Sequence, residues 1–539
     1  MNKKGPPSGA LRGHRFHTTK QNPSGKLGMQ SIHISEPMTG TNEMPSKPPK
    51  SASNNQDQKR KMTLDPQDPY RSAEKLVDYL FRSGGFRTLH YHRGQFWYLR
   101  DGCYQGLDMD EVKNAIWTFL NDALMMTEKG HQDFKPKTDS VNNVFGALKS
   151  VCEVASQCEP PAWLRHYNDE PGASADQLAL HPRDMLIVGN GILHVPTSSL
   201  YAPSPALFVQ SASSVRFDRT AERPRQWHKF LDQVLDKEAQ RTLQTWFGYN
   251  LTPDTSLQKI MALIGPPRSG KGTIGRVMRA MLGERSVGSV TLASLSSDFG
   301  LQQLIGKPSC LIPDARFGKK SDPAAVAERL LSISGEDAIV IARKFLGDYV
   351  GQLPTRFTLM TNELPYVLDS SGAVVNRFII LTMQQSFLGK EDPTLFERLL
   401  VELPGILNWS IEGFHMLRDE GRFVQPVSSA DTIEEMAALS SPVMDFVGEM
   451  CDLDPEWSVD KRELFISWGN WCTAQGRSQG TAPIFSRDLK AAFPQIGTAR
   501  PRVGDRKRVY TGIRLVERQA PVGPRSATYV SAHGAGRGK

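Results

Sequence analysis

Short alternating runs of apolar and polar residues follow one another from Pro69 to about residue 222. Residues 89–92 and 95–99 predict two strands joined by a turn at Arg93 and Gly94. The same reasoning predicts helices around 76–81 and 112–120, a turn at Asp101 and Gly102, and strands at 185–188, 191–195 and 207–210. We therefore predict a small α/β domain over residues 69–222.

Two aspartates, Asp108 and Asp110, lie just before the second of these helices. Paired aspartates of this kind also occur in primase-polymerases. We favour a solvated turn that leads into a helix at 111–121, because aspartate is a preferred residue at helix N-termini.

Longer apolar runs without alternation mark the middle of the chain. Residues 260–264, 309–313, 356–361 and 378–381 each form such a run and predict buried strands. Helical spacing fills residues 224–250 and 395–420. This mixture of strands and helices predicts the α/β fold class.

The pattern changes again near the C-terminal end. Residues 440–517 predict three helices followed by a pair of strands, the second at 509–515. That order is typical of a winged helix, a relative of the helix-turn-helix with a β-wing, and we assign it to residues 426–518. The basic run Arg506, Lys507 and Arg508 lies between the two predicted strands.

Charge is unevenly distributed along the chain, whose net charge is +8. Residues 1–62 contain 11 Lys/Arg against 3 Asp/Glu, and residues 486–539 contain 12 against 3, so the part between them is acidic. Residues 1–68 are rich in Pro, Gly, Ser, Asn and Lys and predict a disordered basic tail, and residues 519–539 predict a second flexible basic tail. Basic ends suit a polyanion such as DNA, although they can also serve solubility.

Composition also limits the cellular setting. The six cysteines are scattered without paired ligand spacing, which predicts reduced thiols in a cytoplasmic protein and no zinc site. We identify neither a secretory signal nor an apolar run of the roughly 18 residues that a membrane helix needs. We expect no membrane partner.

A glycine-rich loop follows the first of the buried strands. Its residues are Gly265, Pro266, Pro267, Arg268, Ser269, Gly270, Lys271, Gly272 and Thr273. A strand, a tight loop and a helix in this order present backbone N–H groups to phosphate, and Lys271 would reach the β- and γ-phosphates of a nucleotide. Gly272 takes the usual place of a magnesium-binding hydroxyl, so we assign that role to Thr273.

Three polar residues follow or precede other buried strands. Asp314 ends the run at 309–313 and could hold magnesium, while a structural turn or cap is the alternative. Asn362 ends the run at 356–361 and could orient an attacking water, although alone it would indicate an ordinary turn. Arg377 precedes the run at 378–381 and could contact the γ-phosphate of a neighbouring subunit, or simply lie on the surface.

Two further features bear on the chemistry. Ala315 and Arg316 follow Asp314, so the glutamate expected as general base is missing there, and Glu328, Glu336 and Asp337 are the remaining candidates. Arg343 and Lys344 lie in a predicted loop or hairpin and could contact a DNA backbone.

Taken in order, these segments resemble superfamily 3 helicases, and within them the phage and plasmid primase-helicase family that includes poxvirus primase-helicase relatives. The resemblance is strong over about 225–425 and weaker on either side. It rests on the loop at 265–273, Ile-Pro-Asp314, Ser-Gly-Glu336-Asp, Thr-Asn362-Glu-Leu-Pro and Asn-Arg377-Phe.

The resemblance implies an AAA+-like ATPase domain over residues 223–425 that uses ATP and Mg²⁺, assembles into a hexameric ring and moves 3′ to 5′ on single-stranded and forked DNA. It gives Lys271 and Thr273 the phosphate-loop roles, Asp314 the metal role, Asn362 the sensor role and Arg377 the finger role. Lys344 would contact DNA, and Arg343, Arg506, Lys507 and Arg508 are further DNA-binding candidates. We expect helicase activity without primase activity, and a separate primase as a possible partner.

Two other functions remain open at this point. The loop also resembles that of adenylate kinases, which would transfer phosphate to a small acceptor. The missing glutamate is compatible with a DNA-binding replication initiator that uses ATP only as a switch.

Overall fold

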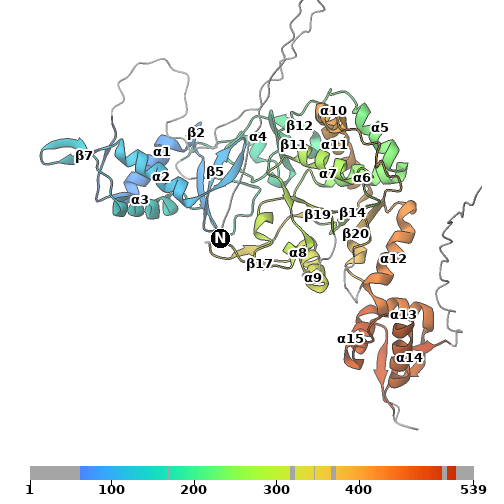
Figure 1. The fold of residues 1–539 in the computed structure, drawn as a ribbon. Coiled ribbons are helices and arrows are strands. Elements are labelled where there is room, and N and C mark those ends of the chain that lie inside the picture. The colour runs from blue at the N-terminus through green and yellow to red at the C-terminus, as the bar shows by residue number, and fades with distance from the viewer. Residues whose placement is uncertain are drawn as a thin grey trace, which may run out of the picture. The chain divides into compact units, whose positions relative to one another are not determined.

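A computed structural model describes residues 61–166, 169–315, 322–344, 346–365, 372–500 and 507–516 (Figure 1). The described residues form a mixed α/β structure with a five-stranded parallel sheet and several small, mostly antiparallel sheets. Among these residues no helix combines the length and apolarity that crossing a bilayer requires. The predicted α/β fold class is confirmed at this level.

The first part of the chain combines three helices with short strands. The predicted strand pair is present as β4 (Leu89–His92) and β5 (Gln95–Arg100). Asp108 caps α2, which begins two residues before the expected start at 111. The other elements are β1 (Thr63–Leu64), α1 (Pro69–Leu80), β2 (Arg82–Ser83), β3 (Phe86–Arg87), β6 (Cys103–Leu107), α2 (Met109–Asn121), β7 (Leu124–Thr127), β8 (Gly130–Asp133) and α3 (Thr138–Val151).

Residues 162–208 add a second group of small elements. They are β9 (Ala162–Trp163), α4 (Ala175–Leu178), β10 (Met185–Val188), β11 (Gly191–His194), β12 (Ser199–Tyr201) and β13 (Leu207–Phe208). The predicted strand at 207–210 is therefore shorter than expected.

Regular structure is present within a segment that we predicted to be disordered. Leu64, which we placed in the disordered tail, is 2% exposed and lies in β1, and β1 pairs in parallel with β7. Two strand residues give no local periodicity, so this pairing with a partner about 60 residues away could not be detected from the sequence. Residues 1–60 lie outside the described part of the chain.

The parallel sheet organises the middle of the chain (Figure 1). Its order is β15-β16-β19-β14-β20, and all neighbouring strands run parallel. The strands are β14 (Ile260–Ile264), β15 (Val287–Ser289), β16 (Ser309–Pro313), β19 (Arg356–Thr361) and β20 (Phe378–Thr382).

Helices surround this sheet, and a separate two-stranded hairpin lies between β16 and β19 in the sequence. The helices are α5 (Arg225–Val234), α6 (Lys237–Tyr249), α7 (Lys271–Leu282), α8 (Leu292–Leu295), α9 (Pro323–Ser334), α10 (Leu395–Val401) and α11 (Leu403–Glu420). The hairpin consists of β17 (Ile339–Ile341) and β18 (Tyr349–Gly351). The helical stretch predicted at 224–250 is two helices, because Asp236 caps α6 by accepting a hydrogen bond from the Ala239 N–H at 2.8 Å.

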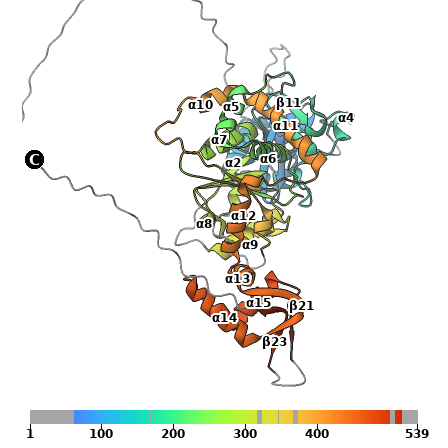
Figure 2. The same cartoon turned by 90° about the vertical axis from the view of Figure 1, so that its right-hand side faces the viewer.

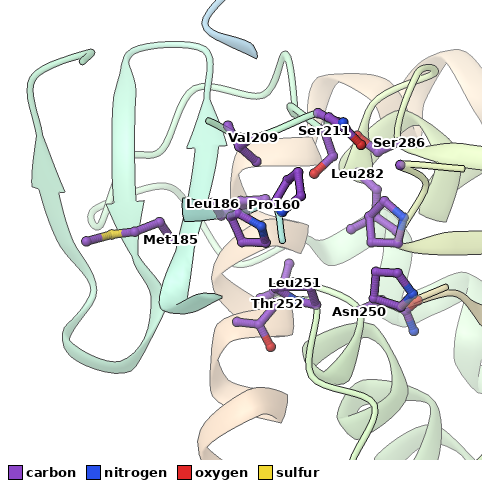
Figure 3. Close-up of a pocket in the computed structure, with 16 residues that line it drawn as sticks. Pro160, Met185, Leu186, Val209, Ser211, Asn250, Leu251, Thr252, Leu282 and Ser286 are labelled. Atoms are coloured by element: carbon purple, nitrogen blue, oxygen red, sulfur yellow. The ribbon is translucent and has the colours of Figure 1, made fainter. Parts of the chain in front are cut away.

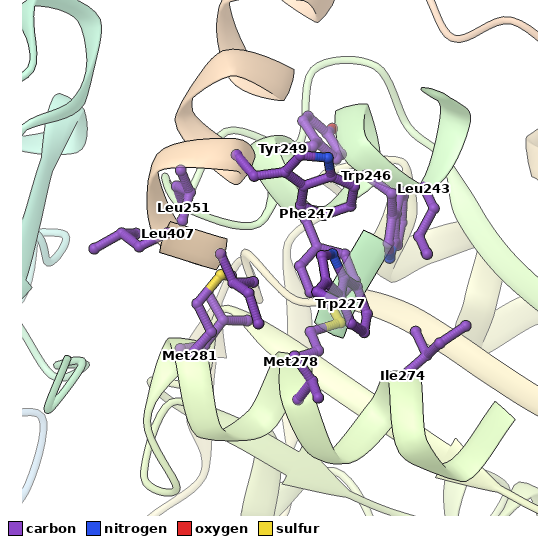
Figure 4. Close-up of a cluster of buried hydrophobic side chains, with 14 of the residues drawn as sticks. Trp227, Leu243, Trp246, Phe247, Tyr249, Leu251, Ile274, Met278, Met281 and Leu407 are labelled. Atoms are coloured by element: carbon purple, nitrogen blue, oxygen red, sulfur yellow. The ribbon is translucent and has the colours of Figure 1, made fainter. Parts of the chain in front are cut away.

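Both faces of β14 are buried, which explains its unbroken apolar run. Met261 and Leu263 belong to a core shared with α5, α6, α7 and α11 (Figure 4). Ile260 and Ala262 belong to a second core, shared with α8 and α9. Parallel strands covered by helices on both faces characteristically read as continuous apolar segments.

A small cavity of about 50 Å³ lies where β10 and the segment after β13 meet the end of α7 (Figure 3). Pro160, Leu186, Leu251 and Leu282 line it. It has room for a few water molecules at most, so we assign it no ligand.

The C-terminal module differs from its prediction in one element (Figure 2). A ten-residue strand, β21, lies between two helices and forms an antiparallel sheet of order β21-β23-β22. Pro455 and the alternating acidic residues of β21 hid this edge strand from sequence patterns, and its pairing with β23 shifts register between Leu453 and Ser458. The elements are α12 (Ala430–Ser440), α13 (Pro442–Met450), β21 (Cys451–Asp460), α14 (Lys461–Ala474), α15 (Ala482–Ala492), β22 (Gly497–Ala499) and β23 (Val509–Leu515).

A buried histidine cluster lies in the first part of the chain. His90 is fully buried, its Nε2 lies 3.1 Å from the Tyr104 hydroxyl, and its ring stacks on His166 with centroids 5.2 Å apart. Because the Tyr104 hydroxyl donates to the Pro205 carbonyl, Nε2 of His90 must be the donor in their hydrogen bond. Burial, and then the nearby His166, Arg87 and His92, hold the pKa of His90 well below its usual value.

We predict that this cluster makes the fold acid-sensitive. The unfolded chain binds a proton at His90 below about pH 6.5 while the folded chain does not, so stability is complete above that pH and falls as the pH drops below it. The slope contributed by His90 is about 1.4 kcal/mol per pH unit. Urea unfolding between pH 8 and pH 5 measures it, and His90→Phe should flatten the curve whereas exposed His131→Phe should not. An unchanged slope in the His90 variant would refute the assignment.

Candidate functional site

The loop between β14 and α7 depends on two glycines. Gly270 has φ of +101°, and a Cβ there would lie 3.1 Å from Phe230 and from Val234 of α5. A Cβ on Gly265 would lie 2.4 Å from the Met383 carbonyl oxygen. No side chain caps the N-terminus of α7, so the first turn of this twelve-residue helix offers its N–H groups to a ligand.

Lys271 occupies the centre of this loop. Its Nζ donates hydrogen bonds to the carbonyls of Gly265 at 2.6 Å and Pro266 at 2.8 Å, and to Oγ of Ser269 at 3.1 Å. The residue is 8% exposed, and burial lowers its pKa. Three neutral oxygens leave the positive charge of the ammonium uncompensated, so an anion entering the loop would meet a partly desolvated cation.

A cavity of about 780 Å³ opens in front of the loop. Arg268 to Thr273 line one side, Asn362 lines another, and α5, α7 and α10 supply most of the rest. Its ionisable lining residues are six cations, Lys229, Arg268, Lys271, Arg276, Lys390 and Arg398, and two acids, Glu391 and Asp392. The cavity is thus a cationic site in an otherwise acidic part of the chain.

The two acids are already engaged. Glu391 lies 3.4 Å from Nε of Arg268, and Asp392 pairs with Nη2 of Arg398 at 2.7 Å. Hydrogen bonds from Arg398 and then Thr394 hold the pKa of Asp392 below its usual value. Such a carboxylate stays ionised and is a poor general base.

The parallel sheet brings the predicted polar residues at the strand ends to one edge. Ile264 pairs with Thr361, and Pro313 pairs with Met360. Gly265, Asn362 and Asp314 therefore follow the carboxyl ends of three adjacent strands. Asn362 reaches the cavity, whereas Asp314 is not among the residues that line it.

Asp314 and Thr273 are the predicted metal ligands. Asp314 is exposed and has a positive φ of 59°, a left-handed conformation that aspartate tolerates better than most residues. Oγ1 of Thr273 accepts a hydrogen bond from Nη2 of Arg276 at 3.4 Å. Within the described ranges no group of three or more His, Cys, Asp or Glu residues could hold a metal by itself.

Arg377 lies at the opposite edge of the sheet. It precedes β20, whose first residue pairs with Ile260 at the start of β14. Five strand residues at about 3.3 Å each place it about 16 Å from the loop. Its Nη1 donates to the Leu331 carbonyl at 2.9 Å and to Oγ of Ser334 at 2.8 Å, so within its own chain it holds the end of α9.

The three candidate bases do not line the cavity either. Glu336 has φ of +65° and accepts a hydrogen bond from the Thr255 hydroxyl, and its carbonyl accepts one from Nε2 of Gln352. Asp337 follows it, and Glu328 is exposed on α9. The structure thus leaves the general base unidentified among the described residues of this chain.

The two basic residues Arg343 and Lys344 lie in different environments. Arg343 is 9% exposed, and its guanidinium donates to the carbonyls of Gly347 at 2.7 Å and Arg93 at 2.8 Å. Lys344 is exposed, with its Nζ 5.8 Å from the centre of the Phe299 ring. The geometry therefore gives Arg343 a structural task and leaves Lys344 and the half-exposed Phe299 as the accessible cation and ring.

The basic residues of the C-terminal module gain two neighbours that the sequence did not suggest. Lys507 and Arg508 are exposed, while Arg506 lies outside the described residues. Burial, and then Lys490 and Arg508, lower the pKa of Lys461. Lys461 on α14 and Lys490 on α15 thus lie near Arg508, although they are separated widely in sequence and no local pattern connects them.

We predict that Arg343 and Lys344 respond differently to substitution. Arg343→Ala leaves two carbonyls without their donor and should lower the free energy of unfolding by about 2 kcal/mol, whereas exposed Lys344→Ala should stay within about 0.5 kcal/mol of the wild type. Urea unfolding measures both. Equal stability of the two variants would contradict the structural role of Arg343.

Comparisons with known proteins bear on the same region. Residues 263–377 match a family described as a family of unknown function (DUF5906). The match begins in β14 and ends at Arg377, so it contains the loop, Asp314 and Asn362.

Among solved structures, the apo structure of the NrS-1 C terminal region (305-718) is similar, with 12% sequence identity and a TM-score of 0.47 over 83% of this chain and 99% of that one. The A form apo structure of the NrS-1 C terminal region-CTR has 15% identity and a TM-score of 0.37 over 55% of this chain and 77% of that one. These likenesses are too distant to assign an activity.

Proposed function

We propose that this chain is an ATP-dependent DNA helicase of the superfamily 3 type, acting in the replication of a phage, plasmid or integrated mobile element. The observation that carries the proposal is the cavity in front of the 265–273 loop. It joins a glycine-rich turn, an uncapped helix N-terminus, Lys271 and Asn362 in one space with five further cations and two acids.

This arrangement suits the triphosphate of a nucleotide. Residues 63–485 are acidic overall. The excess of cations in the cavity is therefore a specific property of this site and points to an anionic ligand. Ser269 and Lys271 would bind phosphate oxygens, and the N–H groups at the start of α7 would add further donors. Asn362 would orient a group at the far end of the phosphate chain.

The residues present also suit a magnesium ion. Thr273, in the first turn of α7, and Asp314, after β16, both emerge at the carboxyl edge of the sheet. Hydroxyl and carboxylate oxygens are the ligands that Mg²⁺ prefers alongside substrate phosphate. When bound, the ion would supply charge neutralisation at the phosphates.

The position of Arg377 favours a site shared between subunits. An arginine about 16 Å from its own loop, on the other edge of the sheet, cannot reach a nucleotide bound there. In a ring, the edge that bears Arg377 would face the loop of the next subunit. Arg377 would then exchange its bonds to Leu331 and Ser334 for the γ-phosphate.

The DNA-binding part of the proposal rests on two surfaces. Lys344 and Phe299 offer a cation and a ring beside the β17–β18 hairpin, as single-stranded DNA requires. From α13 onward, the C-terminal module has the order helix, strand, helix, helix, strand, strand, which suits a winged helix. It also gathers Lys461, Lys490 and Arg508.

A second candidate is an ATP-switched DNA-binding replication initiator. One observation favours it: none of Glu328, Glu336 and Asp337 lines the cavity. A site that binds ATP but hydrolyses it slowly would need no general base. A nucleotide kinase has no comparable support.

Lys271→Ala tests the phosphate site. The substitution removes the ammonium at the centre of the loop, and we expect ATP hydrolysis to fall by at least about 100-fold. Steady-state phosphate release measures the rate, and Lys237→Ala, which removes an exposed lysine of α6, is the control. Near-normal hydrolysis by the Lys271 variant would exclude this loop as the phosphate site.

Mixing two inactive variants tests the shared site. Rings assembled from Lys271→Ala and Arg377→Ala subunits contain some interfaces with both residues intact, so we expect part of the ATPase activity to return. Thermal unfolding of the Arg377 variant controls for its contacts with α9. If mixed rings form and remain inactive, Arg377 does not act across an interface.

A further inference from the structure

The order of the sheet determines which way a bound nucleotide must point. Asn362 follows β19, which lies on one side of β14, and β20 lies on the other side. If the terminal phosphate lies toward Asn362, the nucleoside must leave the loop on the side of β20. The residues beyond β20, together with α5 and α10, form that part of the cavity.

One face of α5 is suited to contact the nucleoside. Gln226, Lys229, Phe230 and Gln233 recur at helical spacing and all line the cavity. The neighbouring face of α5 is held in the core by Trp227, which lies beside α7 (Figure 4), and Phe230 belongs to the same core. The direction of the polar face is therefore set by the packing of α5.

The two glutamines lie at different distances from the loop. Gln233 is adjacent to Val234, whose side chain is the near neighbour of Gly270. Gln226 lies seven residues earlier, about 10 Å further along the helix axis, where Glu402 accepts its backbone N–H at 2.9 Å. That separation is comparable with the length of a nucleoside.

Apolar side chains line the same cavity as the side-chain amides of Gln226 and Gln233. Phe387, Leu395 and Phe396 line the cavity and are partly exposed, and the Arg276 guanidinium lies 4.7 Å from the centre of the Phe396 ring. Phe387 is held near the loop because its N–H donates to the Arg268 carbonyl at 3.0 Å. A flat base can pack on such rings while its edge meets the polar face of α5.

We infer that the cavity contains a nucleoside subsite, in which Gln233 binds the ribose, Gln226 reads the base edge and Phe387 packs on the base. The inference rests on the proposed function and identifies adenine as the preferred base. A carboxamide offers one donor and one acceptor, which match N6 and N7 of adenine but only partly match the two acceptors O6 and N7 of guanine.

Binding of three ligands to the full chain tests the inference. We would measure the affinities for ATP, GTP and inorganic tripolyphosphate by calorimetry, in wild type, Gln226→Ala, Gln233→Ala and Phe387→Leu. Gln475→Ala, an exposed glutamine outside the cavity, is the control. We expect Gln226→Ala to lower ATP affinity about three- to tenfold and to reduce the preference for ATP over GTP. Gln233→Ala and Phe387→Leu should weaken ATP and GTP alike.

Tripolyphosphate separates this inference from the proposed function. All variants should bind it as the wild type does, because the loop is unchanged, and normal binding also shows that they are folded. If the wild type binds neither ATP nor tripolyphosphate, the proposed function itself fails. If it binds both equally well, or if the glutamine variants bind ATP normally, there is no nucleoside subsite. An equal loss of ATP and tripolyphosphate in the glutamine variants would also overturn the inference.

Discussion

The insertion of β19 between β14 and β16 is the constraint on which the candidate site depends. It places Asn362 next to the loop at 265–273 and Asp314 one strand further away, while all three positions remain at the carboxyl edge of the sheet. Because β20 runs parallel to β14, Arg377 at its start lies at the end of the strands away from the loop. The strand order places β20 on the side of β14 opposite to β19, where we infer the nucleoside subsite. The parallel sheet thus fixes where Asn362, Arg377 and the β20 side of the cavity lie relative to the loop.

Packing between α6 and β19 holds the strands behind the loop in place. Nε1 of Trp246 on α6 donates to the buried hydroxyl of Thr358 on β19 at 2.9 Å. Arg356, at the start of β19, is 2% exposed and donates to carbonyls on both sides, including Tyr249 at 3.0 Å and Pro308 at 2.9 Å. Burial lowers its pKa to about 10, which still leaves it protonated at neutral pH. Helix α6 and β19 are therefore joined by polar contacts as well as by the apolar core.

Local signals made much of this arrangement predictable. The apolar runs, the glycine-rich loop and the polar residues at strand ends were found from sequence because each depends on residues close together in the chain. Strand order, the pairing of β1 with β7 and the edge strand β21 depend on distant partners, so local patterns did not show them. The same limit hid Gln226, Lys229 and Arg398 as cavity residues and the engagement of Arg343 with Arg93. For Arg377, the pairing of β20 with β14 showed its distance from the loop, and for the candidate bases, only the lining of the cavity showed that they lie outside it.

The central claim is that one chain couples a nucleotide site to DNA. Its most direct test is the ATP hydrolysis rate of the full chain with and without single-stranded DNA, on protein whose oligomeric state is measured by mass. We predict that a ring-forming preparation hydrolyses ATP and that single-stranded DNA accelerates the reaction several-fold. Hydrolysis that is absent, or that is indifferent to DNA at every oligomeric state, would contradict the account.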